Sequence, residues 1–148
     1  MCNDPDLSFD LDRFAPYRLA VAAQRVSDAL ARIYRDRFGI RVPEWRVLAH
    51  LSAAGGDPVS VRDIEARVGL EKSTVSRAAS RLEVAGHIEK RQDARDGRLV
   101  ALRLTPKGHA LMADLLPQAA AFQKAFEAQL GADYAALDRG LQAILDAP

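Results

Sequence analysis

Apolar residues recur every three or four positions from about Phe14 to Phe38, which predicts one long amphipathic helix. Gly39 is expected to end this helix, because glycine readily takes the left-handed conformation that closes a helix. A second, shorter helix is predicted from Pro43, since proline suits the first position of a helix. Val42 stands before it, where a Ser or Thr cap is usual.

The segment VSVRDIEARVGL carries the clearest local helix signal in the sequence. Ser60 and Asp63 have the spacing of a capping pair, so a helix is predicted to begin directly after Ser60. It is expected to end at Gly69, which favours a tight turn. A further helix is predicted over residues 72–85. Two short helices joined by a glycine turn form a helix-turn-helix.

The two faces of the helix over residues 72–85 differ in chemistry. The buried face is predicted to consist of Val75, Ala78, Ala79, Leu82 and Ala85. The polar face combines hydroxyls with cations: Lys72, Ser73, Thr74, Ser76, Arg77, Ser80 and Arg81. A solvated helix face usually pairs Glu with Lys, whereas hydroxyls and arginines can donate hydrogen bonds to phosphate oxygens and base edges. This face is therefore predicted to contact DNA; an ordinary polar face with helix caps is the alternative.

Two strands are predicted next, over residues 87–92 and 99–105, joined through the sequence DARDGR. In the second strand Val100, Leu102 and Leu104 alternate with Ala101 and Arg103, so one side is expected to lie on the core. The dipeptide Asp-Gly at 96–97 favours a tight hairpin turn. A hairpin that directly follows a helix-turn-helix is a wing.

The wing sequence places Arg95 and Arg98 near the hairpin tip. If the helix over residues 72–85 enters a major groove, these arginines would reach the flanking minor groove, where negative potential attracts arginine. Asp93 and Asp96 stand two residues before each arginine and could orient it. A surface charge cluster of little energetic weight is the alternative.

Two more helices are predicted after the wing, one capped by Thr105 and interrupted by Pro117, where a kink is expected, and the other over residues 133–145. The first carries an apolar stripe of Leu111, Leu115, Ala119, Phe122, Phe126 and Leu130, and the second one of Leu137, Leu141, Ile144 and Leu145. This is more apolar surface than one small domain easily covers. A dimer interface is therefore predicted, with an intramolecular helical layer as the alternative.

The composition, 49% hydrophobic and 28% charged over 148 residues, is that of one folded domain. From Arg62 to Lys107, 11 Lys and Arg stand against 7 Asp and Glu, a local net charge of +4, although the whole chain carries only +1. This basic middle suits phosphate binding. Cys2 is the single cysteine, which excludes an internal disulfide and a cysteine-based metal site. Neither a signal peptide nor a membrane span is recognisable, so a cytoplasmic protein is expected.

The order and spacing of these motifs resemble the MarR family of bacterial winged helix-turn-helix regulators. PEWRVLAHL is similar to the family's second helix, VSVRDIEARVGLEKSTVSRAASRLEVAGHIEKR to its two reader helices and the following strand, and DARDGRLVALRLTPKGHAL to its wing and the next helix. The resemblance implies a mainly α fold with a small β wing, in one domain of residues 1–148. It implies dimerisation helices over 11–39 and 106–146 and a DNA-binding lobe over 43–104.

The resemblance further implies a homodimer in which each subunit reads half of a near-palindromic operator on double-stranded DNA. Carried onto this sequence, the groove and phosphate contacts would be Ser73, Thr74, Ser76, Arg77 and Arg81, with Lys72 and Arg95 beside them on the same two elements. Arg98, oriented by Asp96, would be the minor-groove arginine. Repression is the family's commoner mode.

Many members of the family release DNA when a small aromatic or anionic effector binds between the dimer helices and the DNA-binding lobe. The candidate effector contacts in this sequence are Arg18, Trp45, Arg46 and His50; a packed, hydrogen-bonded histidine is the alternative reading of His50. Oxidation sensing through Cys2 is disfavoured, because Cys2 stands in a terminal segment.

An enzyme is the main rival class, and the sequence argues against it. His50, His87 and His109 lie in different predicted elements without metal-ligand spacing, and no nucleophile with a neighbouring base or glycine-rich phosphate loop is present. No cofactor is expected. The second rival is a winged helix used for protein contact without operator binding.

Overall fold

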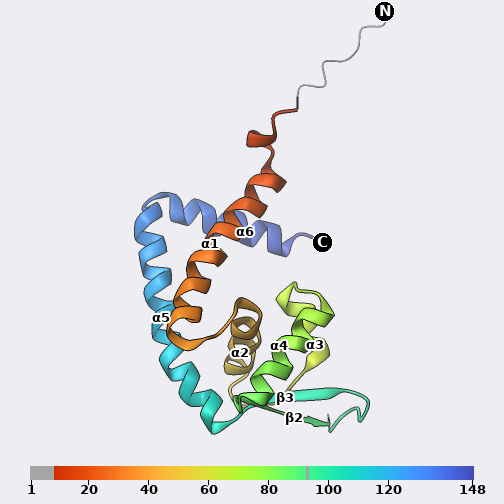
Figure 1. The fold of residues 1–148 in the computed structure, drawn as a ribbon. Helices are drawn as coiled ribbons and strands as arrows, with labels where there is room; N and C mark the ends of the chain where they lie inside the picture. The colour runs from red at the N-terminus through yellow and green to blue at the C-terminus, as the bar shows by residue number, and fades with distance from the viewer. Residues whose placement is uncertain (1–8, 93) are drawn as a thin grey trace, which may run out of the picture. The chain divides into compact units, whose positions relative to one another are not determined.

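The computed structural model describes residues 9–92 and 94–148. This part of the chain forms six α-helices and a small three-stranded antiparallel sheet, which confirms the predicted mainly helical fold with a β wing (Figure 1). Contacts divide the chain into two compact units, one up to Val42 and the other Pro43–Pro148. Cys2 and Asp93 lie outside the described residues.

The first unit consists of a short 3₁₀ helix, η1 (Leu11–Arg13), and the long helix α1 (Ala15–Phe38). Gly39 ends α1 in the left-handed conformation, with φ of 65°, and its N–H donates to the Arg35 carbonyl at 3.0 Å. A side chain other than glycine would be strained there. The predicted long helix and its end are therefore confirmed.

The second unit contains α2 (Val42–Ala53) and the two-residue strand β1 (Val59–Ser60), followed by α3 (Val61–Val68) and α4 (Lys72–Val84), which form the helix-turn-helix. The Ser60 hydroxyl accepts a hydrogen bond from the Asp63 N–H at 3.0 Å, which confirms the predicted cap of α3. Gly69 then turns the chain toward α4 with φ of 66°. The helix α2 begins at Val42, one residue before the predicted start, so Val42 is helical and is not a cap.

The sheet has the strand order β1-β3-β2, in which β2 (Ile88–Gln92) and β3 (Val100–Leu104) form the wing. Both pairings are antiparallel, and Gln92 lies opposite Val100. The predicted tight turn at Asp96-Gly97 is wrong, because the pairing of Gln92 with Val100 leaves a longer loop between the two strands. Gly97 does not have the positive φ that such a turn requires. Instead the Leu99 N–H donates to the Asp96 carbonyl at 2.9 Å and closes a turn one step later.

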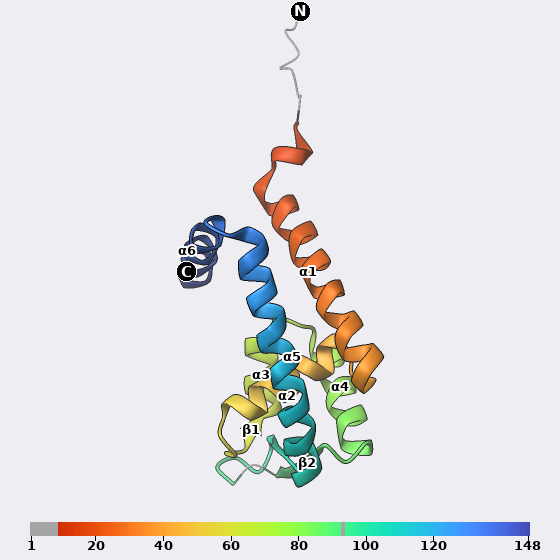
Figure 2. The same ribbon diagram turned by 90° about the vertical axis from the view of Figure 1, so that its left-hand side faces the viewer.

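The two last helices are α5 (Pro106–Leu130) and α6 (Asp133–Asp146). The Thr105 hydroxyl accepts from the Gly108 N–H at 3.1 Å, which confirms the predicted cap of α5. Pro117 lies inside α5, and the helix continues past it to Leu130. Figures 1 and 2 show α5 leading away from the base of the wing, with α6 at its far end.

The core of the second unit is built from the inner faces of its helices and sheet. Its fully or almost fully buried side chains include Val47, Leu48, Leu51, Ile64, Val75, Ala78, Ala79, Leu82, Ile88, Leu102, Leu104, Met112 and Leu115. Two predicted core positions are wrong. Ala85 is exposed because it is the C-cap of α4, and Val100 is 44% exposed because it stands at the loop end of β3. Ala101 is buried instead, since β3 is the central strand.

Candidate nucleic-acid interface

The outer face of α4 carries the predicted hydroxyls and cations. Lys72, Ser73, Ser76 and Arg77 are exposed there, and Thr74 is half-buried. Val75, Ala78, Ala79 and Leu82 on the inner face are buried, which anchors the helix with its polar side outward. The structure therefore brings these five polar residues onto one exposed surface, as the sequence predicts.

A surface hollow of about 490 Å³ lies between α3, α4 and the wing. We call it the cationic hollow, and its charged or polar lining comprises Arg62, Glu65, Lys72, Ser76, Lys90 and Arg98. The four cations come from α3, α4, β2 and the wing loop, with Glu65 as the one acidic side chain of the lining. Positive charge from four segments thus converges beside the exposed face of α4.

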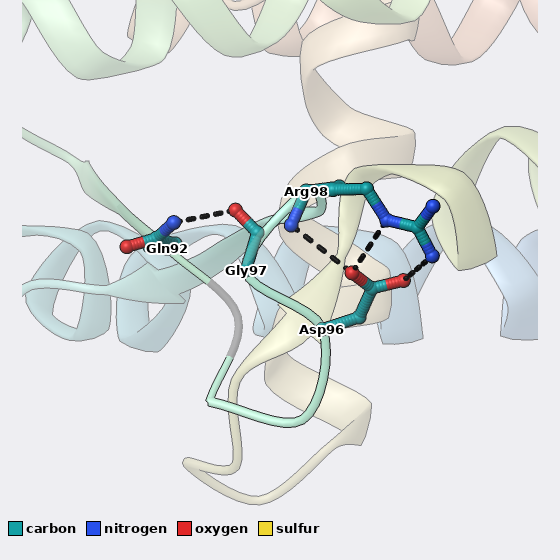
Figure 3. Close-up of polar contacts among 4 residues, drawn as sticks. All are labelled: Gln92, Asp96, Gly97 and Arg98. Atoms are coloured by element: carbon teal, nitrogen blue, oxygen red, sulfur yellow. Dashed lines mark hydrogen bonds and ion pairs between the residues drawn. The ribbon is translucent and has the colours of Figure 1, made fainter.

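The wing loop is organised around Asp96 (Figure 3). Its Oδ1 accepts from the Arg98 backbone N–H at 3.1 Å and from the Arg98 Nε at 3.2 Å, and its Oδ2 accepts from Nη2 at 3.4 Å. The Gln92 side chain donates to the Gly97 carbonyl at 2.5 Å and braces the same loop. The predicted orientation of Arg98 by Asp96 is therefore present.

This arrangement affects both members of the pair. The hydrogen bonds from the Arg98 side chain and backbone hold the pKa of Asp96 below its usual range, so the carboxylate stays ionised. The Arg98 side chain is 90% exposed even though it is paired. A guanidinium fixed on one edge and open on the other can bind a second anion.

The structure separates Arg95 from this cluster. Arg95 lines a different hollow, of about 610 Å³, which also includes Asp57, Glu89 and Arg103. Asp93, its predicted orienting partner, lies outside the described residues. Only Arg98 of the two wing arginines lines the cationic hollow.

Arg81 differs from the other predicted DNA contacts, because it is held by an acidic residue of another helix. Its Nε lies 2.5 Å from Oε1 of Glu44 on α2, and the Glu44 side chain is only 6% exposed. The sequence did not predict this partner, since the two residues lie 37 positions apart.

Two cations of the hollow were also missed by sequence reasoning. Arg62 lies in the first turn of α3, and Lys90 lies on β2, where its Nζ donates to the Ser80 hydroxyl at 3.3 Å. The alternation of β2 could have identified Lys90. Residues two apart in a strand lie on the same face, so Lys90 lies on the same side of the sheet as the buried Ile88. No local signal marks Arg62, which reaches the hollow only through the packing of α3 on α4 and β3.

The candidate effector contacts stand on two helices. Arg18 is exposed on α1, and Trp45, Arg46 and His50 are half-buried on α2. Arg46 Nη1 lies 3.4 Å from the Val68 carbonyl, where a cation suits the negative end of the α3 dipole. This contact shows a structural role for Arg46 beside the predicted one.

Comparison with known proteins shows which family has this sequence and fold. The MarR family model matches residues 38–99. The solved structure of the PcaV transcriptional regulator from Streptomyces coelicolor, in complex with its natural ligand, is 30% identical and has a TM-score of 0.73. The similarity covers 95% of this chain and 97% of that one. The chain belongs to the MarR family.

Two curated proteins are similar to this MarR-family chain. The HTH-type transcriptional regulator TtmR of Methylorubrum extorquens (strain PA1) is 32% identical over 105 residues, which cover 68% of this chain and 53% of TtmR. The transcriptional repressor MprA of Escherichia coli (strain K12) is 29% identical over 79 residues, covering 53% of this chain and 45% of MprA. The match thus spans about half the length of each. The family and the fold are those of transcriptional regulators.

None of the helices formed by residues 9–92 and 94–148 has the length and apolar character needed to cross a bilayer.

Proposed function

We propose that this protein is a sequence-specific regulator that binds double-stranded DNA as a homodimer and represses transcription from a near-palindromic operator. The observation that carries the proposal is the convergence of Arg98, held by Asp96, with the exposed polar face of α4 around one cationic hollow. Four cations line this hollow. Arg98 is paired with Asp96 and Lys90 with Glu83, and Glu65 also lies in the lining, so a positive charge remains that suits phosphate binding.

Each part of this surface suits one part of a DNA duplex. The hydroxyls and Arg77 on α4 suit the major groove, where Arg and Ser donate to base edges and phosphates. Arg98 suits the narrow minor groove beside it. Arg62 and Lys90 line the same hollow as Arg98 and suit neighbouring phosphates. Removal of any one cation is expected to weaken binding without unfolding the lobe.

The exposed apolar surface of α6 supports a homodimer. Leu141, Ile144 and Leu145 are 43%, 55% and 77% exposed on a helix that is well formed. A second copy that covers this surface would gain hydrophobic free energy at about 25 cal/mol per Å². Two-fold symmetry would then place the two α4 helices in successive major grooves, about 10 base pairs apart.

Control by a small effector is part of the proposal. The related PcaV was solved with its natural ligand, and the related MprA is named a repressor. In this chain Arg18, Trp45, Arg46 and His50 offer cationic and aromatic groups that suit a small aromatic or anionic molecule. Titration of aromatic carboxylates into a protein–operator complex tests this: release of the DNA supports the assignment, and unchanged binding across the set argues against it.

Selection from randomised duplexes, followed by fluorescence anisotropy of the selected and scrambled DNA, tests the DNA-binding proposal. At several salt concentrations the selected duplex should bind more tightly, with log affinity falling against log salt by about 0.9 per neutralised phosphate. Equal, weak binding to both duplexes would favour the alternative of a protein-interaction module.

A matched pair of variants sharpens this test. Arg98→Ala should lower affinity for the selected duplex by roughly tenfold to a hundredfold, as expected for loss of a groove-bound arginine. Arg139→Ala removes the same charge from an exposed position on α6, opposite the Leu137 and Leu141 side of that helix. Its affinity should stay close to wild type. An equal loss of affinity in both variants would show that Arg98 acts only through the net charge of the protein and not through a specific contact of the wing.

A further inference from the structure

The contact between Arg81 and Glu44 joins α4 to α2 at a buried position. Glu44 is a carboxylate within the first turn of α2, and its residue exposure is 5%. Arg81 Nε approaches it to 2.5 Å from the last turn of α4, while the Arg81 side chain keeps 41% of its surface exposed. The charged head of Arg81 is thus directed into the protein, although its residue type and helix face suggest a DNA contact.

Such a pair constrains geometry more than apolar packing does. Hydrophobic contacts along Val75, Ala78 and Leu82 are non-directional, so they tolerate small rotations of α4 about its axis. A charge-assisted hydrogen bond to a fixed carboxylate has a narrow range of distances and angles. A buried carboxylate that lost this donor would also be left less well compensated.

Rotation of α4 bears directly on DNA reading. Ser73, Ser76 and Arg77 project from the same helix, so a change in its rotation moves all of them relative to a groove. Because Arg81 lies in the last turn, one residue after Ser80 and three before the helix end, it holds the end of α4 that is farthest from Ser73.

We propose that Arg81 is a positioning residue, which fixes the rotation of α4 through Glu44 and does not itself bind DNA. This inference rests on the proposed function of α4 as the DNA-reading helix. It assigns to Glu44, a residue with the wrong charge for DNA, a contribution that favours DNA binding.

Glu44→Gln separates the two roles of Arg81 by the sign of its effect. If Glu44 positions α4 through Arg81, removal of its charge weakens the pair and should lower operator affinity by about tenfold. If Arg81 is a phosphate contact that Glu44 only neutralises, the same change removes a negative charge near DNA and should raise affinity. Fluorescence anisotropy on the selected duplex distinguishes these outcomes, and an increase or no change overturns the inference.

Glu44→Asp is the charge-conserving partner variant. It keeps the carboxylate but withdraws it by one methylene, so positioning predicts weaker operator binding, whereas a purely electrostatic role predicts wild-type affinity. Thermal unfolding of both variants shows whether the lobe is folded at the temperature of the assay. If Glu44→Gln is unfolded there, Glu44→Asp decides the question alone.

Arg77→Ala provides the contrast expected of a direct contact. Loss of a phosphate contact reduces the salt slope by about 0.9, while Arg81→Lys, which keeps the charge, should lower affinity with the slope unchanged. Wild-type affinity in Arg81→Lys contradicts positioning. Failure of the wild-type protein to select any DNA would defeat the proposed function itself; selective wild-type binding that Glu44→Gln strengthens defeats only this inference.

Discussion

Replacement of Gly108 by Ala should destabilise the protein strongly, because the first turn of α5 passes against the backbone of His87. An added Cβ at position 108 would lie 2.0 Å from the His87 carbonyl oxygen and 3.0 Å from its carbonyl carbon. Ordinary van der Waals contact begins near 3.4 Å, so the two segments must separate by about 1.4 Å. The obstacle is backbone, which cannot rotate away as a flexible side chain would.

That separation disrupts the contacts that link Gly86 and His87, just after α4, to Thr105, just before α5. The Thr105 N–H donates to the same His87 carbonyl at 3.1 Å, and the Thr105 hydroxyl lies 2.5 Å from the Gly86 carbonyl. A shift of this size removes at least the first bond, at about 1–3 kcal/mol for the unsatisfied groups. Residual overpacking adds about 1–3 kcal/mol.

Helix propensity offsets a part of this cost. Ala is favoured over Gly inside a helix by about 1 kcal/mol. The expected net loss for Gly108→Ala is therefore about 3 kcal/mol. With an unfolding entropy of about 2.1 cal/mol/K per residue, this loss lowers the Tm by about 10 °C in a chain of 148 residues.

Calorimetry or thermal circular dichroism at one fixed protein concentration measures this effect. Gly140→Ala is the matched control, because Gly140 lies inside α6 and, apart from its chain neighbours and that helix's own backbone, no atom of the described residues lies within 4 Å of the added methyl group. Propensity alone should raise its Tm by about 3 °C. A Tm for Gly108→Ala at or above that of the wild type would refute the expected clash with the His87 carbonyl.

Three further perturbations test local features of the second unit. Ser60→Ala removes the cap of α3 and should cost about 1 kcal/mol, seen as a lower urea midpoint at unchanged m-value. Burial and the nearby charge of Lys107 hold the pKa of His87 below its ordinary 6.5. The unfolded chain therefore binds a proton more readily than the folded one, so stability should fall as the pH drops below about 6.5. His87→Gln should flatten this dependence between pH 7.5 and 5.5, and an unchanged slope would contradict the role of His87. Asp96→Asn should lower operator affinity although it makes the wing more positive, because Arg98 loses its orienting carboxylate. If fluorescence anisotropy showed that Asp96→Asn binds the operator more tightly, the added positive charge would matter more than the orientation of Arg98.

Local backbone preference accounts for the parts of the fold that sequence reasoning predicted correctly. Gly39 and Gly69 both take the positive φ that ends their helices, and Ser60 and Thr105 both cap the helices that follow them. These features depend on residues within one turn of each other, so the sequence alone is sufficient to place them. The apolar period of α4 belongs to the same class, and four of its five predicted core residues are buried.

Register and packing account for the predictions that were wrong. The pairing of Gln92 with Val100 decides the length of the wing loop, and no pattern within the loop reports this register. Ala101 is buried because β3 lies between two strands, and its small side chain gives no sequence signal of this burial. The strand β1 is too short for a periodic signal.

In the candidate site, too, local features were predictable from the sequence, whereas contacts between distant segments were not. The sequence by itself determined that α4 has an exposed face of hydroxyls and cations and that Asp96 precedes Arg98 by two residues, because both are relations between near neighbours. Only the tertiary structure decided that Arg62 and Lys90 join this surface, that Arg95 does not, and that Arg81 turns inward to Glu44. The charge of a side chain is a property of the residue, whereas its partner depends on which distant segment the folded core brings beside it.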